Sequence, residues 1–155
     1  MLPIIKKTLT NFLLFFFSSL LFSESEDISI VIHGGAGWFS SMTKEEISGI
    51  ESALNKAADL GYKVMLEGGT SLDAVEQAII ILENNPLFNA GKGSVYTSEL
   101  KQEMDASIMD GSNLDAGAVA SVTSVKNPIT LARHVMENTE PVSYTHLTLP
   151  TTQVV

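Results

Sequence analysis

Cysteine is absent from this 155-residue sequence, and histidine is scarce. Without cysteine, a disulfide framework, a thiolate zinc site and a cysteine nucleophile are all excluded. The three histidines, His33, His134 and His146, stand far apart and form no H-x-x-x-H pair. A metal site carried on a helix is therefore not expected.

Positive charge is also in short supply, since 9 lysines and arginines stand against 18 aspartates and glutamates, for a formal net charge of -9. Binding to nucleic acid depends on clustered lysine and arginine that displace counterions from the phosphates. The sequence has no such basic stripe, so nucleic acid is excluded as a partner. Its 45% hydrophobic content is enough for one ordinary folded domain.

The one long apolar run covers residues 12–22; two lysines precede it, and Ser23 and Ser25 follow it. A basic start, a short apolar stretch and small residues at a cleavage point are the layout of a signal peptide. The run is shorter than the roughly 20 apolar residues that a membrane-spanning helix needs. We therefore expect residues 1–25 to be a cleaved signal peptide rather than an uncleaved anchor, and the protein to be exported to the periplasm or secreted.

The remaining sequence predicts an α+β fold without internal repeats. Apolar residues at helical spacing and at alternating spacing indicate, in order, a buried strand, two helices, two paired strands and a third helix. The expected ranges are 28–32, 44–67, 71–84, 104–109, 116–122 and 128–137. Thr70 with Asp73 matches a capping box at the start of the second helix. Asn127 before Pro128 matches an N-cap followed by a proline in the first helical position.

A glycine-rich loop, residues 33–37, follows the first expected strand and lets backbone amides approach a ligand closely. A dinucleotide fingerprint fails here because Ser40 occupies the third glycine position. Residues 91–93 are similar to the end of a P-loop, but Gly93 replaces the serine or threonine that binds magnesium. Two interpretations of His33 stay open: a buried histidine at a strand end with a backbone partner, or a direct catalytic role.

Residues 82–93 form an irregular loop that is too long for a plain turn. Together with other stretches, this loop resembles the isoaspartyl peptidase/L-asparaginase family, the plant-type asparaginases. The stretches are H-G-G-A-G at 33–37, P-L-F-N-A-G-K-G at 86–93, M-D-A-S-I-M-D-G at 104–111, G-A-V-A at 117–120 and N-P-I at 127–129. Glycosylasparaginases share the aspartate-rich strand but not the P-L-F-N loop, so the asparaginase branch is favoured over that alternative.

The resemblance implies the N-terminal half of an Ntn-hydrolase αββα sandwich. Such a precursor cuts itself before a threonine, and this threonine peptidase then uses the new N-terminus to hydrolyse L-asparagine and β-aspartyl (isoaspartyl) dipeptides. A free N-terminal amine serves as a base for its own hydroxyl. The implied partners are a small amide or dipeptide substrate and a C-terminal (β) subunit, in an αβ heterodimer that pairs into a dimer.

The resemblance also implies roles for residues of this chain. Asn89 would lie beside the nucleophile and orient it, with a loop-closing side chain as the alternative. The loop His33, Gly34, Gly35, Ala36 and Gly37 would lie next to the active site. No cofactor is implied beyond a structural sodium ion, held by the main-chain oxygens of Leu82, Glu83, Asn85, Phe88, Ala90 and Lys92. No catalytic residue itself falls in this chain, because the nucleophile, the substrate-binding arginine and the oxyanion site belong to the C-terminal half.

We expect the family domain to cover residues 26–140 and residues 141–155 to be a non-family tail. Residues 142–151 resemble the translation of an adaptor used in DNA library preparation, so an assembly artefact is expected there. The sole Gly-Thr step, Gly69-Thr70, is better explained by the helix cap than by self-cleavage. The chain as given is therefore expected to be inactive, and the remaining alternative is a secreted, non-enzymatic binding or structural protein.

Overall fold

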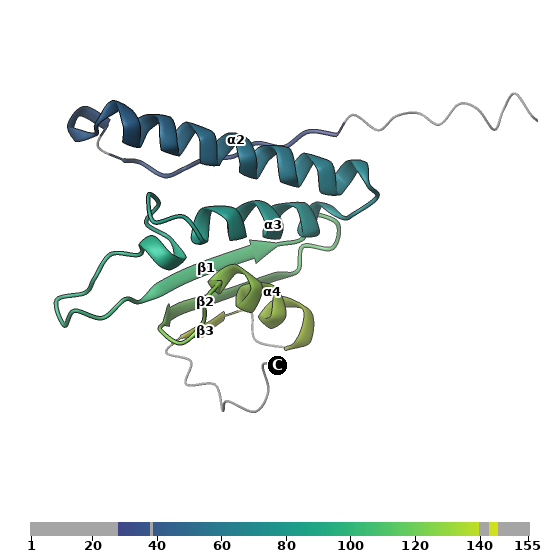
Figure 1. The fold of residues 1–155 in the computed structure, drawn as a ribbon. Coiled ribbons are helices and arrows are strands. Elements are labelled where there is room, and N and C mark those ends of the chain that lie inside the picture. Colours follow the sequence, from purple (N-terminus) through teal and green to yellow (C-terminus); the bar gives the residue numbers. More distant parts are fainter. Residues whose placement is uncertain (1–27, 38, 140–142, 146–155) are drawn as a thin grey trace, which may run out of the picture.

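A computed structural model describes residues 28–37, 39–139 and 143–145. Two long helices lie side by side above a small sheet, and a shorter helix covers one face of that sheet (Figure 1). The elements, in chain order, are η1 (Phe39–Ser41), α2 (Lys44–Leu66), α3 (Ser71–Glu83), η2 (Gly91–Gly93), β1 (Met104–Met109), β2 (Ala116–Val122), α4 (Pro128–Asn138) and β3 (Ser143–Thr145).

The helices α2 and α3 both begin with a capping box. Thr70 accepts the backbone N–H of Asp73 at 3.1 Å, and the Asp73 carboxylate accepts the backbone N–H of Thr70 at 2.9 Å. Thr43 and Glu46 repeat this arrangement at the start of α2. These reciprocal bonds satisfy backbone donors that a helix start leaves open. The predicted helix ranges and the Thr70 cap are thereby confirmed, to within one residue at the C-terminal ends.

The strands β1 and β2 pair in antiparallel register, with Ala106 opposite Val119 and a bulge between Met104 and Ala106. Both predicted ranges are confirmed. The helix α4 packs against this pair, and its close approach depends on Gly117. A Cβ at that position would overlap the carbonyl oxygen of Ala132 in α4. A glycine is therefore required in β2 at the point where the helix crosses it.

The prediction of a strand at residues 28–32 is wrong, because these residues form no strand in the structure. These residues run beside α2 without strand pairing, and Val31 is 94% exposed. A strand forms only where a neighbouring strand accepts and donates its hydrogen bonds, and the described sheet, β1-β2-β3, does not include this segment. Ile30 and Ile32 turn to the helices instead, since Ile30 lies against Gly61 of α2 and Ile32 packs on the core between α2 and α3.

The strand β3 pairs with β2 in parallel register and lies in the region predicted to be a non-family tail, of which the structure describes residues 143–145 alone. The described residues hold one three-stranded sheet, so the mixed α+β arrangement agrees with the sequence while the second sheet of a sandwich stays a prediction. None of the helices among the described residues is both long and apolar enough to cross a membrane. The predicted signal peptide lies outside the described residues.

Candidate active site

A pocket of about 790 Å³ lies between the extended N-terminal segment, the helix pair and the loop after α3. Its wall includes all of the glycine loop 33–37, together with Asn89 and Ala90. The large apolar side chains that line it are those of Ile32, Met42, Ile50, Leu54, Leu82, Leu87 and Phe88. The structure therefore brings together two motifs that the sequence places far apart.

The glycine loop approaches the helix pair closely and carries an internal hydrogen bond. The backbone N–H of Gly35 donates to Nδ1 of His33 at 3.0 Å, and Gly35 has φ +95°, which favours glycine. A Cβ on Gly34 would lie only 3.1 Å from the Phe88 ring. His33 thus has the predicted backbone partner, but it is exposed rather than buried, because residues 28–32 are not inside a sheet.

Asn89 closes its own loop with one end of its side chain. Its Oδ1 accepts the backbone N–H of Val95 at 3.0 Å, and its Nδ2 makes no hydrogen bond to any residue that the structure describes. The loop-closing interpretation therefore fits the amide oxygen. The amide nitrogen remains a donor on the wall of the pocket, where an orienting role for it is still a prediction.

The main-chain oxygens predicted to hold a sodium ion all belong to the stretch from the end of α3 to η2. Those of Asn85 and Ala90 each accept one turn hydrogen bond, which leaves a second lone pair on each oxygen, whereas that of Leu82 accepts from the N–H groups of both Asn84 and Asn85. The oxygens of Glu83 and Phe88 face Gly91 and Gly93, where a Cβ would overlap them. Oxygen donors at the negative end of a helix suit a hard cation, and the sodium ion itself stays a prediction.

The described residues contain no group of three or more histidine, aspartate or glutamate side chains placed to hold a metal ion.

Sequence reasoning missed the carboxylate of Glu83, which is 3% exposed. Its Oε1 accepts the backbone N–H of Ile129 at 2.9 Å, and its Oε2 accepts Nδ2 of Asn127 at 2.9 Å. Burial raises the pKa of Glu83; the two hydrogen bonds oppose this shift, and the charge of Glu76 adds to it. Asn127 precedes α4 as predicted, but its side chain makes no cap bond and binds Glu83 instead.

Comparison with known proteins agrees with the motifs that meet at this pocket. The family model described as asparaginase matches residues 26–147. The chain belongs to this asparaginase family. The matched region extends past residue 140 and includes β3, which the sequence had placed in the tail.

Relatives of known name are similar over most of this chain. The plant-type L-asparaginase of Pyrococcus furiosus is 53% identical over 116 residues, which cover 74% of this chain and 37% of the relative. The human isoaspartyl peptidase/L-asparaginase is 50% identical over 111 residues, 71% of this chain and 35% of the relative. The chain thus spans about a third of the length of these relatives.

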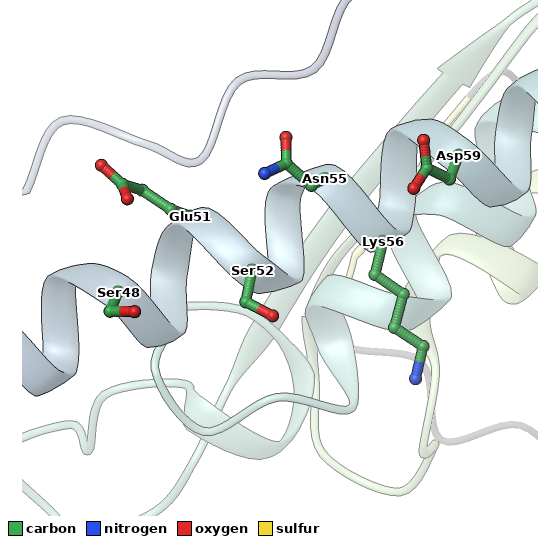
Figure 2. A pocket seen from close by; sticks show the side chains of 6 residues that line it. All are labelled: Ser48, Glu51, Ser52, Asn55, Lys56 and Asp59. Carbon is green, nitrogen blue, oxygen red and sulfur yellow. The ribbon is translucent and has the colours of Figure 1, made fainter.

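A second hollow of about 550 Å³ adjoins the outer face of α2 and involves no motif shared with the asparaginase family. Figure 2 shows side chains from one helix only: Ser48, Glu51, Ser52, Asn55, Lys56 and Asp59. All six are exposed. They form an ordinary solvated helix face.

Proposed function

We propose that the whole protein to which this chain belongs is an amidohydrolase that cleaves L-asparagine and β-aspartyl dipeptides. The observation that carries the proposal is the pocket where the glycine loop meets Asn89. Membership of the asparaginase family and the names of the relatives support the same reaction class. The proposed fold is the N-terminal half of an αββα Ntn-hydrolase sandwich.

In this proposal the nucleophile is a threonine released by self-cleavage, and it comes from outside these 155 residues. The threonine amine accepts the proton of its own hydroxyl, which attacks the substrate amide carbon. The protonated amine gives that proton to the departing ammonia or amine, and water then hydrolyses the acyl ester to release aspartate and restore the threonine hydroxyl. Asn89 donates from Nδ2 and orients the nucleophile, while its Oδ1 stays bonded to Val95. The glycine loop supplies a wall close to the reacting groups in which Gly34, Gly35 and Gly37 leave the backbone uncovered by side chains.

Three further parts of the proposal concern ions, partners and location. The main-chain oxygens at the end of α3 hold a structural sodium ion that keeps the Asn89 loop in shape. The protein is cut into two subunits, which form an αβ heterodimer that pairs into a dimer. A signal peptide at residues 1–25 directs export.

The decisive experiment is to measure ammonia release from asparagine by the full-length gene product and its Asn89→Asp variant. This substitution keeps an oxygen for the N–H of Val95 and replaces the Nδ2 donor with a second, negatively charged oxygen. We expect kcat to fall about 100-fold, as for other lost orienting or oxyanion donors. Asn55→Asp on the outer face of α2 is the matched control and should retain full activity. An active Asn89→Asp enzyme, or a wild type that releases neither ammonia from asparagine nor the free amino acid from β-aspartyl dipeptides, would refute the proposal.

The same assay applied to the 155-residue chain should detect no hydrolysis and no cleavage at Gly69-Thr70. Thr70 is a helix cap whose nitrogen is a peptide amide, so it lacks the free amine that the reaction needs as a base. Thr70→Ala should cost about 1 kcal/mol of stability and change no activity. A fragment that begins at Thr70, seen by mass spectrometry, would contradict this expectation.

A further inference from the structure

Glu83 is a buried carboxylate that pairs with no lysine or arginine among the residues that the structure describes. Its only described side-chain partners are neutral donors, the N–H of Ile129 and the amide of Asn127. A buried charge is costly unless nearby groups replace its hydration. Here the first turn of α4 replaces the lost hydration, because backbone N–H groups at a helix start carry partial positive charge. A carboxylate bound in this way fixes the end of α3 relative to the start of α4.

The main chain of the same residue touches the loop of the candidate active site. A Cβ on Gly91 would overlap the carbonyl oxygen of Glu83 and lie 2.7 Å from its Cβ. Gly91 begins η2, the turn that ends the stretch carrying Asn89. Glu83 therefore meets α4 through its side chain and the Asn89 loop through its backbone.

Other links between α3 and α4 lack this second contact. Arg133 of α4 binds Asp73 and Glu76 of α3, with both distances at 2.8 Å. Neither acid is among the nearest neighbours of Gly91 or Gly93. The Arg133 pairs hold the two helices together, whereas Glu83 connects that helix pair to the pocket.

We propose that Glu83 is a positioning residue. Its carboxylate, bound to the start of α4, fixes the end of α3 and thereby the loop that carries Asn89. The catalytic consequence rests on the proposed function, in which Asn89 orients the nucleophile. The structural claim concerns the placement of the Asn89 loop and stands by itself. Hydrogen bonding rather than charge is the operative property, so a glutamine at this position should serve as well.

The test measures amide hydrogen exchange at Val95, whose N–H bonds to Asn89, relative to Val119 in the sheet core. In the full-length gene product, Glu83→Ala should raise the ratio of the Val95 to the Val119 rate at least tenfold. In Glu83→Gln the ratio should stay within twofold of the wild-type value. Asn127 can turn its amide to accept from the new Nε2, while Oε1 still accepts from the N–H of Ile129. Glu76→Ala is the matched control, an acid on α3 that also contacts α4, and should leave the ratio unchanged.

Two results would overturn the proposal: an unchanged ratio in Glu83→Ala, or a rise of equal size in Glu76→Ala. Kinetics give a separate readout. In Glu83→Ala the displaced Asn89 should lower kcat about tenfold or more, with KM within twofold of wild type. Glu83→Gln should retain the wild-type kcat. If the wild-type protein proves inactive on both amide substrates, the proposed function fails. The exchange ratio still decides the role of Glu83 in that case.

Discussion

The two hydrophobic cores of the molecule are built from different residues. Between the sheet and α4, the core consists of large side chains, with Val119, Val122 and Ile129 at most 2% exposed. Between α2 and α3, it is built largely from Ala53, Ala57 and Ala78, with Leu82 and Phe88 at one end. Small residues let two helices come close, but they fill little space beyond the contact line.

This difference explains where the candidate active site lies. The sheet core is filled by large side chains that are almost fully buried, Val119, Val122 and Ile129 among them. The helix-pair core ends at Leu82 and Phe88, and both of these side chains also line the pocket. The loops that carry the site thus lie at the end of the helix-pair core, away from the core between the sheet and α4.

The largest effect should come from over-packing the closed core with Gly117→Ala. The new Cβ would overlap the carbonyl oxygen of Ala132 and lie 2.6 Å from the amide nitrogen of Met136, and backbone atoms cannot move aside alone. We expect a loss of about 3 kcal/mol in the free energy of unfolding, measured with urea. Gly111→Ala is the control, since nothing lies within 4 Å of its Cβ. Equal losses in both variants would show that this core is not tightly closed.

A smaller effect is expected at Asp73, which connects the two cores by binding Arg133. Hydrogen bonds from the Thr70 hydroxyl and backbone N–H, and then the Arg133 guanidinium, lower the pKa of Asp73 to about 2. A folded-state pKa below the unfolded value stabilises the protein above about pH 4, and this contribution disappears as the pH falls through about 2. Because the carboxylate is 38% exposed, we expect Asp73→Asn to cost only about 1 kcal/mol at pH 7.

Urea unfolding between pH 7 and pH 2.5 measures this contribution. The difference between Asp73→Asn and wild type should shrink steadily below about pH 4. Thr70→Ser keeps the hydroxyl that bonds Asp73 and should follow the wild-type curve. A difference that stays constant over the whole range would contradict the assigned cause.

The smallest effect should come from adding the same methyl group to the open core, in Gly61→Ala. The new Cβ would lie 2.5 Å from Cδ1 of Ile30, the end of a flexible side chain, and 3.1 Å from the carbonyl oxygen of Ala74. The higher helix propensity of alanine, worth about 1 kcal/mol, offsets the cost of moving Ile30. The free energy of unfolding should therefore stay within about 1 kcal/mol of wild type. A loss as large as that of Gly117→Ala would remove the contrast between the two cores.

Local sequence patterns determined most of the elements and the position of the site motifs. The Thr70 cap, Pro128 at a helix start and the alternation in β1 each involve neighbours a few residues apart, so their physics is readable in the chain. The glycine loop and Asn89 were likewise located by their motifs. The sequence did not reveal that the Asn89 oxygen is already bonded to Val95.

Tertiary structure alone decided three other features. Residues 28–32 have the composition of a strand, but pairing needs a partner strand, which sequence composition does not supply. The side chain of Asn127 prefers Glu83 to its own helix, across 44 positions of sequence. Glu83 can remain buried because it meets the start of α4, 46 positions away. Hydrogen-bond partners so distant in the chain are set by how α3 and α4 pack, and no local pattern records that packing.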